Sequence, residues 1–265
     1  MQPKRSGVYI DGLNLYHGAL KDTPYKWLNP ETLVRHLLPL DDIVHIRYFT
    51  ALVNVRRDDP RIQSRHATYL RALSSSELVT VHRGRFTTRV KSRALADAFE
   101  PHNQLFSPRF RPKQLFSMMW ADKVRRRTDS VTLARVVIEE EKGSDVNLGA
   151  YLVNDAARGL IDKALVISND SDLTEAIRLA QGFGILVGTV NPHSAPTSRH
   201  LRSVASFDIP LRPLALVRSQ FPNTVVDGQG REIHKPREWR ETQRPDLSAG
   251  PRAHQPKWMS GMFGK

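Results

Sequence analysis

Short apolar runs separated by helical patterns constrain the fold of this chain more than any other feature of its sequence. The runs at residues 7–10, 163–168 and 185–190 are apolar almost throughout and contain many β-branched side chains. Strands of this kind are typical of a parallel sheet whose two faces are both covered by helices. The sequence therefore predicts an α/β fold, a three-layer α/β/α sandwich with a mainly parallel sheet.

The segments between these runs contain further strands and the starts of helices. Additional strands are expected at residues 43–53, 78–86 and 131–138. Helices are expected at residues 144–158 and 172–181, and two more should begin at Asn29 with Pro30 and at Asp59 with Pro60. Gly159 follows the helix at 144–158, where a glycine commonly ends a helix.

The length of 265 residues fits one α/β domain with an insertion and a tail. We place the domain at residues 6–205, with a basic, loop-rich insertion at about 87–130. Residues 206–240 form a C-terminal extension. The proline-rich C-terminal tail at residues 241–265 is mostly polar, so we expect it to be disordered.

Charge is distributed unevenly along the chain. The formal net charge is +13, yet residues 51–137 contain 18 Lys and Arg against 7 Asp and Glu, while residues 138–217 contain 7 against 10. A basic block of this size favours an acidic partner, most commonly nucleic acid. The alternative is an arginine-rich surface that serves solubility alone, which leaves the separate acidic block unexplained.

Composition also excludes several classes of protein. The chain has no cysteine, which rules out disulfides, thiolate metal sites and a cysteine nucleophile. No run of 18 apolar residues and no signal-peptide pattern occurs in it. We therefore expect a cytoplasmic protein that does not contact a membrane.

Acidic side chains follow three of the predicted strands. Asp11 ends the first strand, Asp145 follows the strand at 131–138, and Asp170 and Asp172 follow the strand at 163–168. Ligands of a doubly wound sheet bind beyond the carboxyl ends of its strands, and right-handed crossovers bring these ends to one edge. We therefore expect the four aspartates to lie close together.

Such a cluster of carboxylates requires a counter-charge. Two carboxylates about 5 Å apart repel by roughly 3 kcal/mol at an effective dielectric constant near 20. Oxygen ligands alone select a hard cation, Mg²⁺ or Mn²⁺, and such ions commonly activate water for phosphoryl chemistry. For each aspartate taken singly, the alternative is an ordinary helix cap.

The roles of the polar residues near these aspartates stay open at the level of the sequence. Asn14 lies one helical turn after Asp11, so it could position Asp11 or a phosphate, or be an ordinary exposed side chain. Strand alternation sends at most two of Glu139, Glu140 and Glu141 in the same direction, which leaves their roles open.

The three acidic segments read VYIDGLNL at residues 8–15, EKGSDVNL at 141–148 and VISNDSDL at 166–173. In this order they resemble the NYN domain family of the PIN-like nuclease superfamily, over about residues 6–205. The resemblance implies a PIN-like α/β/α sandwich that cleaves RNA with the help of metal ions. It assigns metal binding to four aspartates, Asp11, Asp145, Asp170 and Asp172. It assigns a catalytic role to these four and to Asn14.

Arginines of the basic block are the candidates for contact with the substrate backbone. They are Arg83, Arg85, Arg89, Arg109, Arg111, Arg125, Arg126 and Arg127. Arginine contacts phosphates and interleaved aromatic residues stack on unpaired bases, which favours single-stranded RNA, with DNA left open. We therefore predict a metal-dependent endoribonuclease that hydrolyses RNA phosphodiester bonds with Mg²⁺ or Mn²⁺.

Two other functions remain open at this level. One is a non-catalytic RNA-binding protein that retains the PIN-like fold. The other is a protein-interaction module whose tail, residues 222–265, recruits partners. Trp239 and Trp258 lie in this proline-rich segment and either dock on the domain or contact a partner.

Overall fold

The computed structural model describes residues 3–53, 59–94, 121–125 and 130–239, and it contains the predicted α/β fold. Within these ranges an eight-stranded sheet has the order β4-β5-β3-β2-β1-β6-β7-β8. The strands that run parallel are β1 (Arg5–Asp11), β2 (Asp42–Ala51), the first part of β3 (Val79–Ala94), β6 (Lys163–Ile167), β7 (Leu186–Val190) and β8 (Phe207–Asp208). The prediction of a mainly parallel sheet is confirmed.

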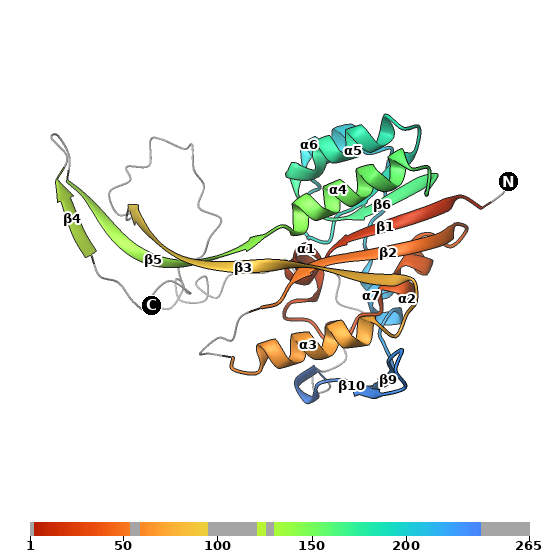
Figure 1. The fold of residues 1–265 in the computed structure, drawn as a ribbon, viewed down its shortest axis with the longest axis horizontal. Helices are drawn as coiled ribbons and strands as arrows, with labels where there is room; N and C mark the ends of the chain where they lie inside the picture. Colours follow the sequence, from red (N-terminus) through yellow and green to blue (C-terminus); the bar gives the residue numbers. More distant parts are fainter. Residues whose placement is uncertain (1–2, 54–58, 95–120, 126–129, 240–265) are drawn as a thin grey trace, which may run out of the picture.

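Helices cover both faces of this sheet, so the body has three layers (Figure 1). One face carries α4 (Ser144–Ala157), α5 (Thr174–Gln181) and α6 (Arg199–Val204). The other face carries α2 (Pro30–Leu37), α3 (Ile62–Leu73) and α7 (Pro213–Arg218). Val8 and Ile10 of β1 belong to the core on the α2 side, and Tyr9 belongs to the core on the α4 side. Burial on both faces is the reason that these strands are apolar throughout.

The predicted helix ends are largely confirmed. Asn29 precedes α2, and its Oδ1 accepts the N–H groups of Glu31 at 3.0 Å and Thr32 at 3.2 Å. Gly159 follows α4 with a φ of 63°, a left-handed conformation that glycine adopts without strain. These interactions are local, which is why the sequence predicted them.

The second half of β3 leaves the body and forms a projecting arm. β3 pairs with β2 only as far as Gly84, and from Arg85 to Ala94 it pairs antiparallel with β5 (Ser130–Lys142). β4 (Ala121–Arg125) pairs with the start of β5 (Figure 1). We call residues 85–94 and 130–142 the β3–β5 arm. The prediction of a loop-rich insertion at 87–130 is therefore wrong for residues 87–94 and 121–125, which are strands, and residues 95–120 lie outside the described ranges.

The C-terminal extension packs on the domain. After β8 and α7, a hairpin of β9 (Thr224–Val226) and β10 (Glu232–His234) leads to Trp239. The Trp239 ring lies 6.0 Å from Trp27 and 6.3 Å from Tyr69 between centroids. Of the two alternatives for Trp239, docking on the domain is therefore correct, whereas Trp258 and residues 241–265 lie outside the described ranges. In the part of the chain that the structure describes, no helix is long and apolar enough to cross a membrane.

Candidate functional site

Asp11 lies at the carboxyl edge of the parallel strands, where β1 ends and α1 (Gly12–Leu15) begins. Its Oδ1 accepts the N–H of Asn14 at 2.9 Å, and its Oδ2 accepts the hydroxyl of Ser168 at 3.0 Å. The side chain is 5% exposed. Asp11 thus caps α1 through one oxygen and contacts the segment after β6 through the other. Its role as a helix cap is therefore compatible with its place in the acidic group.

The loop after β6 brings Asp170 to the same edge, because β6 pairs with β1. The Ser168 hydroxyl that donates to Asp11 also accepts the N–H of Asp170 at 3.1 Å. Asp170 in turn accepts the N–H of Asp172 at 3.0 Å and caps the 3₁₀ turn Ser171–Leu173. Asp172 is exposed and lies at the margin of the group.

Asp145 reaches this edge by a different route from the one predicted. β5 is antiparallel to β3 and returns from the outer end of the β3–β5 arm, with Lys142 opposite Arg85. Because the arm projects beyond the carboxyl edge of the parallel strands, the end of β5 meets that edge from outside. α4 then begins at Ser144 and carries Asp145 in its first turn. The expected location is correct, whereas the expected crossover from a parallel strand is wrong.

Glu141, whose role the sequence left open, belongs to the same group. Its Oε1 accepts both the N–H of Ser144 at 3.1 Å and the hydroxyl of Ser144 at 2.7 Å, which caps α4. Gly84 of β3 makes room for it, because a Cβ there would collide with Glu141 Oε1 and lie 2.8 Å from the carbonyl oxygen of Lys142. The spacing of Glu141 and Ser144 was the one available sequence signal for this cap.

Burial and mutual repulsion raise the pKa values of two of these carboxyl groups. Burial raises the pKa of Asp11 to about 6, with a further rise from Asp170 and Glu141, although the hydrogen bonds from Asn14 and Ser168 act in the opposite direction. Burial, followed by repulsion from Asp11, Asp170, Glu141 and Asp172, raises the pKa of Asp145 to about 7. The sequence therefore correctly predicted that the four aspartates come together.

The group does not form a ready-made metal site. Among the described residues, no three His, Asp or Glu side chains converge closely enough to ligate one ion. The donor set nevertheless fits a hard cation, since it consists of carboxylate oxygens that carry excess negative charge. Mg²⁺ and Mn²⁺ are often held by one or two carboxylates and several waters, which a partly open group of this kind could supply.

Asn14 connects two loops next to this group. Its Oδ1 lies 3.1 Å from the backbone nitrogen of Asn169 and 3.0 Å from Nε2 of His193. Asn169 accepts the N–H of Ser198 at 2.7 Å, which ties the loop after β6 to the loop after β7. Burial lowers the pKa of His193, so its ring is neutral at physiological pH. His193 thus contacts Asn14 and supports the position of its side chain.

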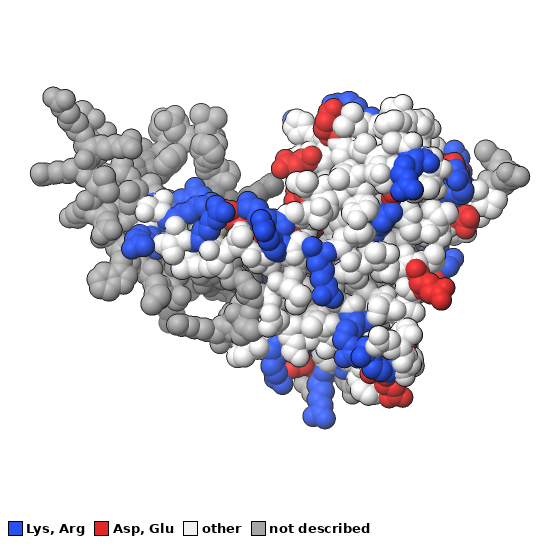
Figure 2. Space-filling view, viewed as in Figure 1, with Lys and Arg blue, Asp and Glu red and all other residues white. Residues whose placement is uncertain are grey.

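The predicted basic residues are only partly described. Arg83, Arg85 and Arg89 are exposed and share one face of β3 by strand alternation, and Figure 2 shows Lys and Arg gathered over the β3–β5 arm. Lys91 on the same face is neutralised by Glu140, with 2.5 Å between Nζ and Oε1. Outside the described residues lie Arg109, Arg111, Arg126 and Arg127, together with the side chain of Arg125.

A buried polar network between β1, β2 and α4 was missed by sequence reasoning. Asp155 is fully buried and accepts hydrogen bonds from Tyr9 Oη at 2.8 Å and from Arg47 Nε at 2.8 Å. Burial alone would raise the pKa of Asp155, but hydrogen bonds from His45, Arg47 and Tyr9 outweigh it and hold that pKa well below its usual range. No local pattern marks these residues, because they are brought together from three separate segments only by the fold.

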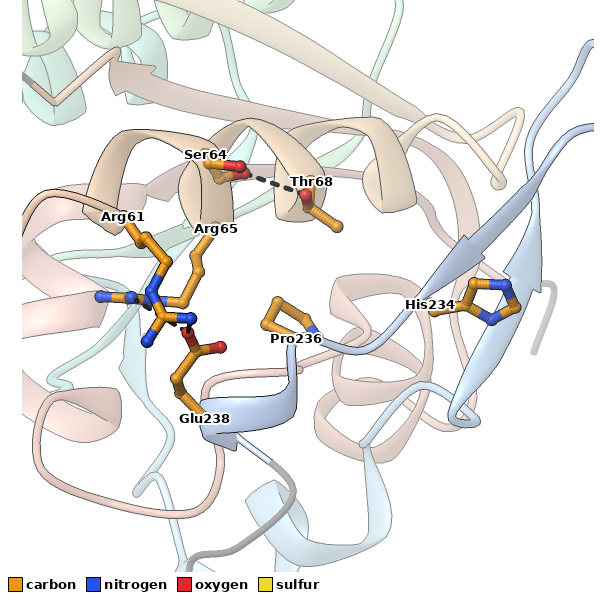
Figure 3. A pocket seen from close by; sticks show the side chains of 7 residues that line it. All are labelled: Arg61, Ser64, Arg65, Thr68, His234, Pro236 and Glu238. Atoms are coloured by element: carbon orange, nitrogen blue, oxygen red, sulfur yellow. Dashed lines mark hydrogen bonds and ion pairs between the residues drawn. The ribbon is translucent and has the colours of Figure 1, made fainter.

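A cleft of about 220 Å³ lies elsewhere, between α3 and the C-terminal segment (Figure 3). Its charged lining is already paired: Arg61 Nη1 lies 3.0 Å from Glu238 Oε1, and Arg65 pairs with Asp59 and Glu238. None of the clustered aspartates lines it. We interpret this cleft as the seam along which the extension packs on α3.

Comparisons with known proteins point to another activity. No family model matches the chain, so its resemblance to the NYN domain family stays a prediction. Over 214 residues the chain is 29% identical to the 6-hydroxy-3-succinoylpyridine 3-monooxygenase HspA of Pseudomonas putida. The match covers 73% of this chain and 61% of that enzyme, so the chain spans about three fifths of the length of its relative.

This relative overturns the predicted function. A monooxygenase is an oxidoreductase, so the predictions of an endoribonuclease and of a non-catalytic RNA-binding protein are both wrong. The physical reason is that carboxylates at strand ends can serve many chemistries, and a fold does not determine which one. The relative is an enzyme, and its activity is not that of a hydrolase. Nothing bears on RNA or DNA as a partner, and contact with either stays a prediction.

A solved structure of a protein of unknown function from Vibrio parahaemolyticus is also similar. The match covers 80% of this chain and 95% of that one, with a TM-score of 0.44 and 12% sequence identity. This similarity is too low to support a statement about fold or function.

Proposed function

We propose that this chain is a metal-dependent oxidoreductase that inserts oxygen into a hydroxylated pyridine or a related heteroaromatic acid. The substrate class and reaction type come from the name of the relative, a 6-hydroxy-3-succinoylpyridine 3-monooxygenase. Such a reaction consumes O₂ and two electrons from a donor such as a reduced nicotinamide. One oxygen atom enters the organic substrate and the other leaves as water.

The grouping of Asp11, Asp145 and Asp170 at one sheet edge is the observation that carries the proposal for this site. Burial, together with mutual repulsion, raises the pKa values of Asp11 and Asp145 to about 6 and about 7. A bound cation would reduce this repulsion, and one or two of these carboxylates together with waters would hold it. When bound, the ion would supply Lewis acidity for substrate oxygens. Mn²⁺ fits an oxidation better than Mg²⁺, because only Mn²⁺ changes oxidation state readily.

The residues of the chain would have distinct tasks around that ion. Ser168 and Glu141 would hold Asp11 and the start of α4 in place through the hydrogen bonds described above. Asn14 and His193 would keep the two adjacent loops together. We retain the PIN-like assignment as part of the proposal for the fold, supported by the meeting of three acidic segments at one sheet edge.

An oxygen-consumption assay tests the proposal. Wild type would receive 6-hydroxy-3-succinoylpyridine, O₂ and reduced nicotinamide in the presence of EDTA, Mg²⁺ or Mn²⁺, with product followed by chromatography and mass. We expect Mn²⁺-dependent oxygen uptake that matches substrate loss and is abolished in Asp170→Asn. Asp162→Asn is the matched control, because Asp162 pairs with Arg5 at the opposite end of β6. A folded wild-type protein that consumes no oxygen with any of these metals would contradict the proposal.

A further inference from the structure

The side-chain amide of Asn14 has only one orientation that its neighbours permit. Its Oδ1 faces the backbone nitrogen of Asn169 at 3.1 Å. A backbone N–H can only donate, so the atom that faces it must be the amide oxygen. The oxygen and nitrogen of an asparagine are otherwise hard to tell apart, but here the hydrogen-bond chemistry decides.

The same oxygen accepts a second hydrogen bond. Nε2 of His193 lies 3.0 Å from Asn14 Oδ1, and since that oxygen cannot donate, Nε2 must carry the proton. An amide oxygen has two lone pairs, and Asn169 and His193 occupy both. Asn14 could therefore ligate a metal ion through its oxygen only by losing one of these bonds.

The amide nitrogen of Asn14 is the free end of this side chain. No described residue accepts a hydrogen bond from Nδ2. Among the described residues, the buried side-chain polar atoms without a partner are His66 Nδ1 and Gln220 Oε1, so Asn14 Nδ2 is not fully buried. Two hydrogen bonds from separate loops thus hold a partly exposed N–H₂ donor beside the carboxylates.

We propose that Asn14 contacts the substrate directly, with Nδ2 donating to an anionic or carbonyl oxygen of a hydroxylated heteroaromatic acid. This inference rests on the proposed function. A group of carboxylates repels an anionic substrate, so recognition requires a donor that no carboxylate has already taken. Asn14 supplies one from a neutral side chain, next to Asp11, whose Oδ1 accepts the backbone N–H of Asn14.

The side-chain amide signals of Asn14 in a ¹⁵N–¹H spectrum test this directly. They are assigned by their loss in Asn14→Asp, and 6-hydroxy-3-succinoylpyridine is then titrated into wild type with Mg²⁺ present. We expect the Asn14 signals to shift and to saturate together with the other affected signals. The amide of Asn191 is the internal control, because its Nδ2 already donates to the Ala195 carbonyl at 2.7 Å.

Kinetics separate substrate contact from metal binding. Asn14→Asp keeps an oxygen for Asn169 and His193 but replaces the donor by an acceptor, so KM should rise about tenfold or more while Mn²⁺ affinity does not fall. Asp162→Asn, which changes a side chain paired with Arg5 at the opposite end of β6, should preserve KM within about threefold.

The outcomes distinguish this inference from the function on which it rests. If the ligand binds and shifts other signals while those of Asn14 stay in place, the contact is wrong and the proposed function stands. If 6-hydroxy-3-succinoylpyridine neither binds nor is oxidised by wild type, the proposed substrate class fails and the inference fails with it.

Discussion

Arg47 on β2 and Asp155 on α4 form a buried ion pair with two hydrogen bonds, 2.8 Å from Nε to Oδ2 and 3.1 Å from Nη2 to Oδ1. The pair joins the sheet to the helix that carries Asp145 in its first turn. The pair therefore affects both how firmly α4 packs on the sheet and where Asp145 lies at the acidic sheet edge.

Loss of the Asp155 charge should destabilise the protein strongly. Asp155→Asn would leave the guanidinium of Arg47 without its counter-charge, and breaking a buried pair costs about 3–5 kcal/mol. Urea denaturation measures this change in the free energy of unfolding. Asp162→Asn, which removes an exposed pair with Arg5, should cost less than about 1 kcal/mol. Equal losses in the two variants would contradict the structural role of Asp155.

Neutralising Asp145 should stabilise the metal-free protein at high pH. Its pKa is raised to about 7 from an ordinary value of 3.8, so ionisation disfavours the folded state as pH rises through that window. We expect Asp145→Asn to gain about 1–2 kcal/mol over wild type at pH 8 in EDTA, after allowing for solvent screening, and almost nothing at pH 4. Thermal melts of both proteins across this pH range measure the difference. A constant difference would mean that Asp145 is not repelled by its neighbours.

A bound divalent cation should stabilise the protein more at high pH than at low pH, which is the opposite of the effect that ionisation of Asp145 has on the metal-free protein. Mn²⁺ binds deprotonated carboxylates, so it should raise the Tm of wild type at pH 8 but not at pH 5, where Asp11 and Asp145 are largely protonated. At a concentration 100 times Kd the expected stabilisation is about 2.7 kcal/mol. Melts with Mn²⁺ and with EDTA check this, and Asp170→Asn should reduce the effect. An equal rise at both pH values would indicate binding elsewhere.

A side chain at Gly84 should disturb the acidic edge. In Gly84→Ala the new Cβ would collide with Glu141 Oε1 and crowd the Lys142 carbonyl, so the cap of α4 must shift. We expect a loss of about 1–3 kcal/mol and weaker Mn²⁺ binding, measured by denaturation and calorimetry. Gly228→Ala is the matched control, because its Cβ would approach nothing closer than 3.9 Å. Unchanged stability in Gly84→Ala would show that Glu141 can move freely.

Removal of the Trp239 ring should loosen the C-terminal extension. Trp239 contacts Trp27 and Tyr69 and is partly buried, so Trp239→Ala should cost about 1–3 kcal/mol, less than a fully buried tryptophan. Denaturation measures the cost, and limited proteolysis should detect earlier cleavage near residues 222–239. Val226→Ala on the same extension, which is 54% exposed there, should change little. If Trp239→Ala and Val226→Ala change stability and proteolysis equally little, the Trp239 ring does not contribute to the core.

The elements that sequence reasoning predicted are those governed by local chemistry. The cap at Asn29 forms within its own segment. The apolar run of β1 indicates its burial on both faces, although the residues that cover it are distant in the chain. The sequence also predicted that Asp11 and Asp170 lie at one edge of the sheet. They do so because β1 and β6 are parallel neighbours whose carboxyl ends share that edge. The predicted nuclease function was wrong, since the same carboxylates suit more than one reaction.

The sequence by itself determined the α/β alternation, the helix ends and the acidic strand ends, because apolar periodicity and capping act over a few residues. Only the tertiary structure decided that β5 returns antiparallel along the arm, that Asp155 pairs with Arg47, and that His193 orients Asn14. The last two of these contacts join residues 108 and 179 positions apart in the chain. Such pairings depend on how whole strands and loops pack, which no local pattern specifies.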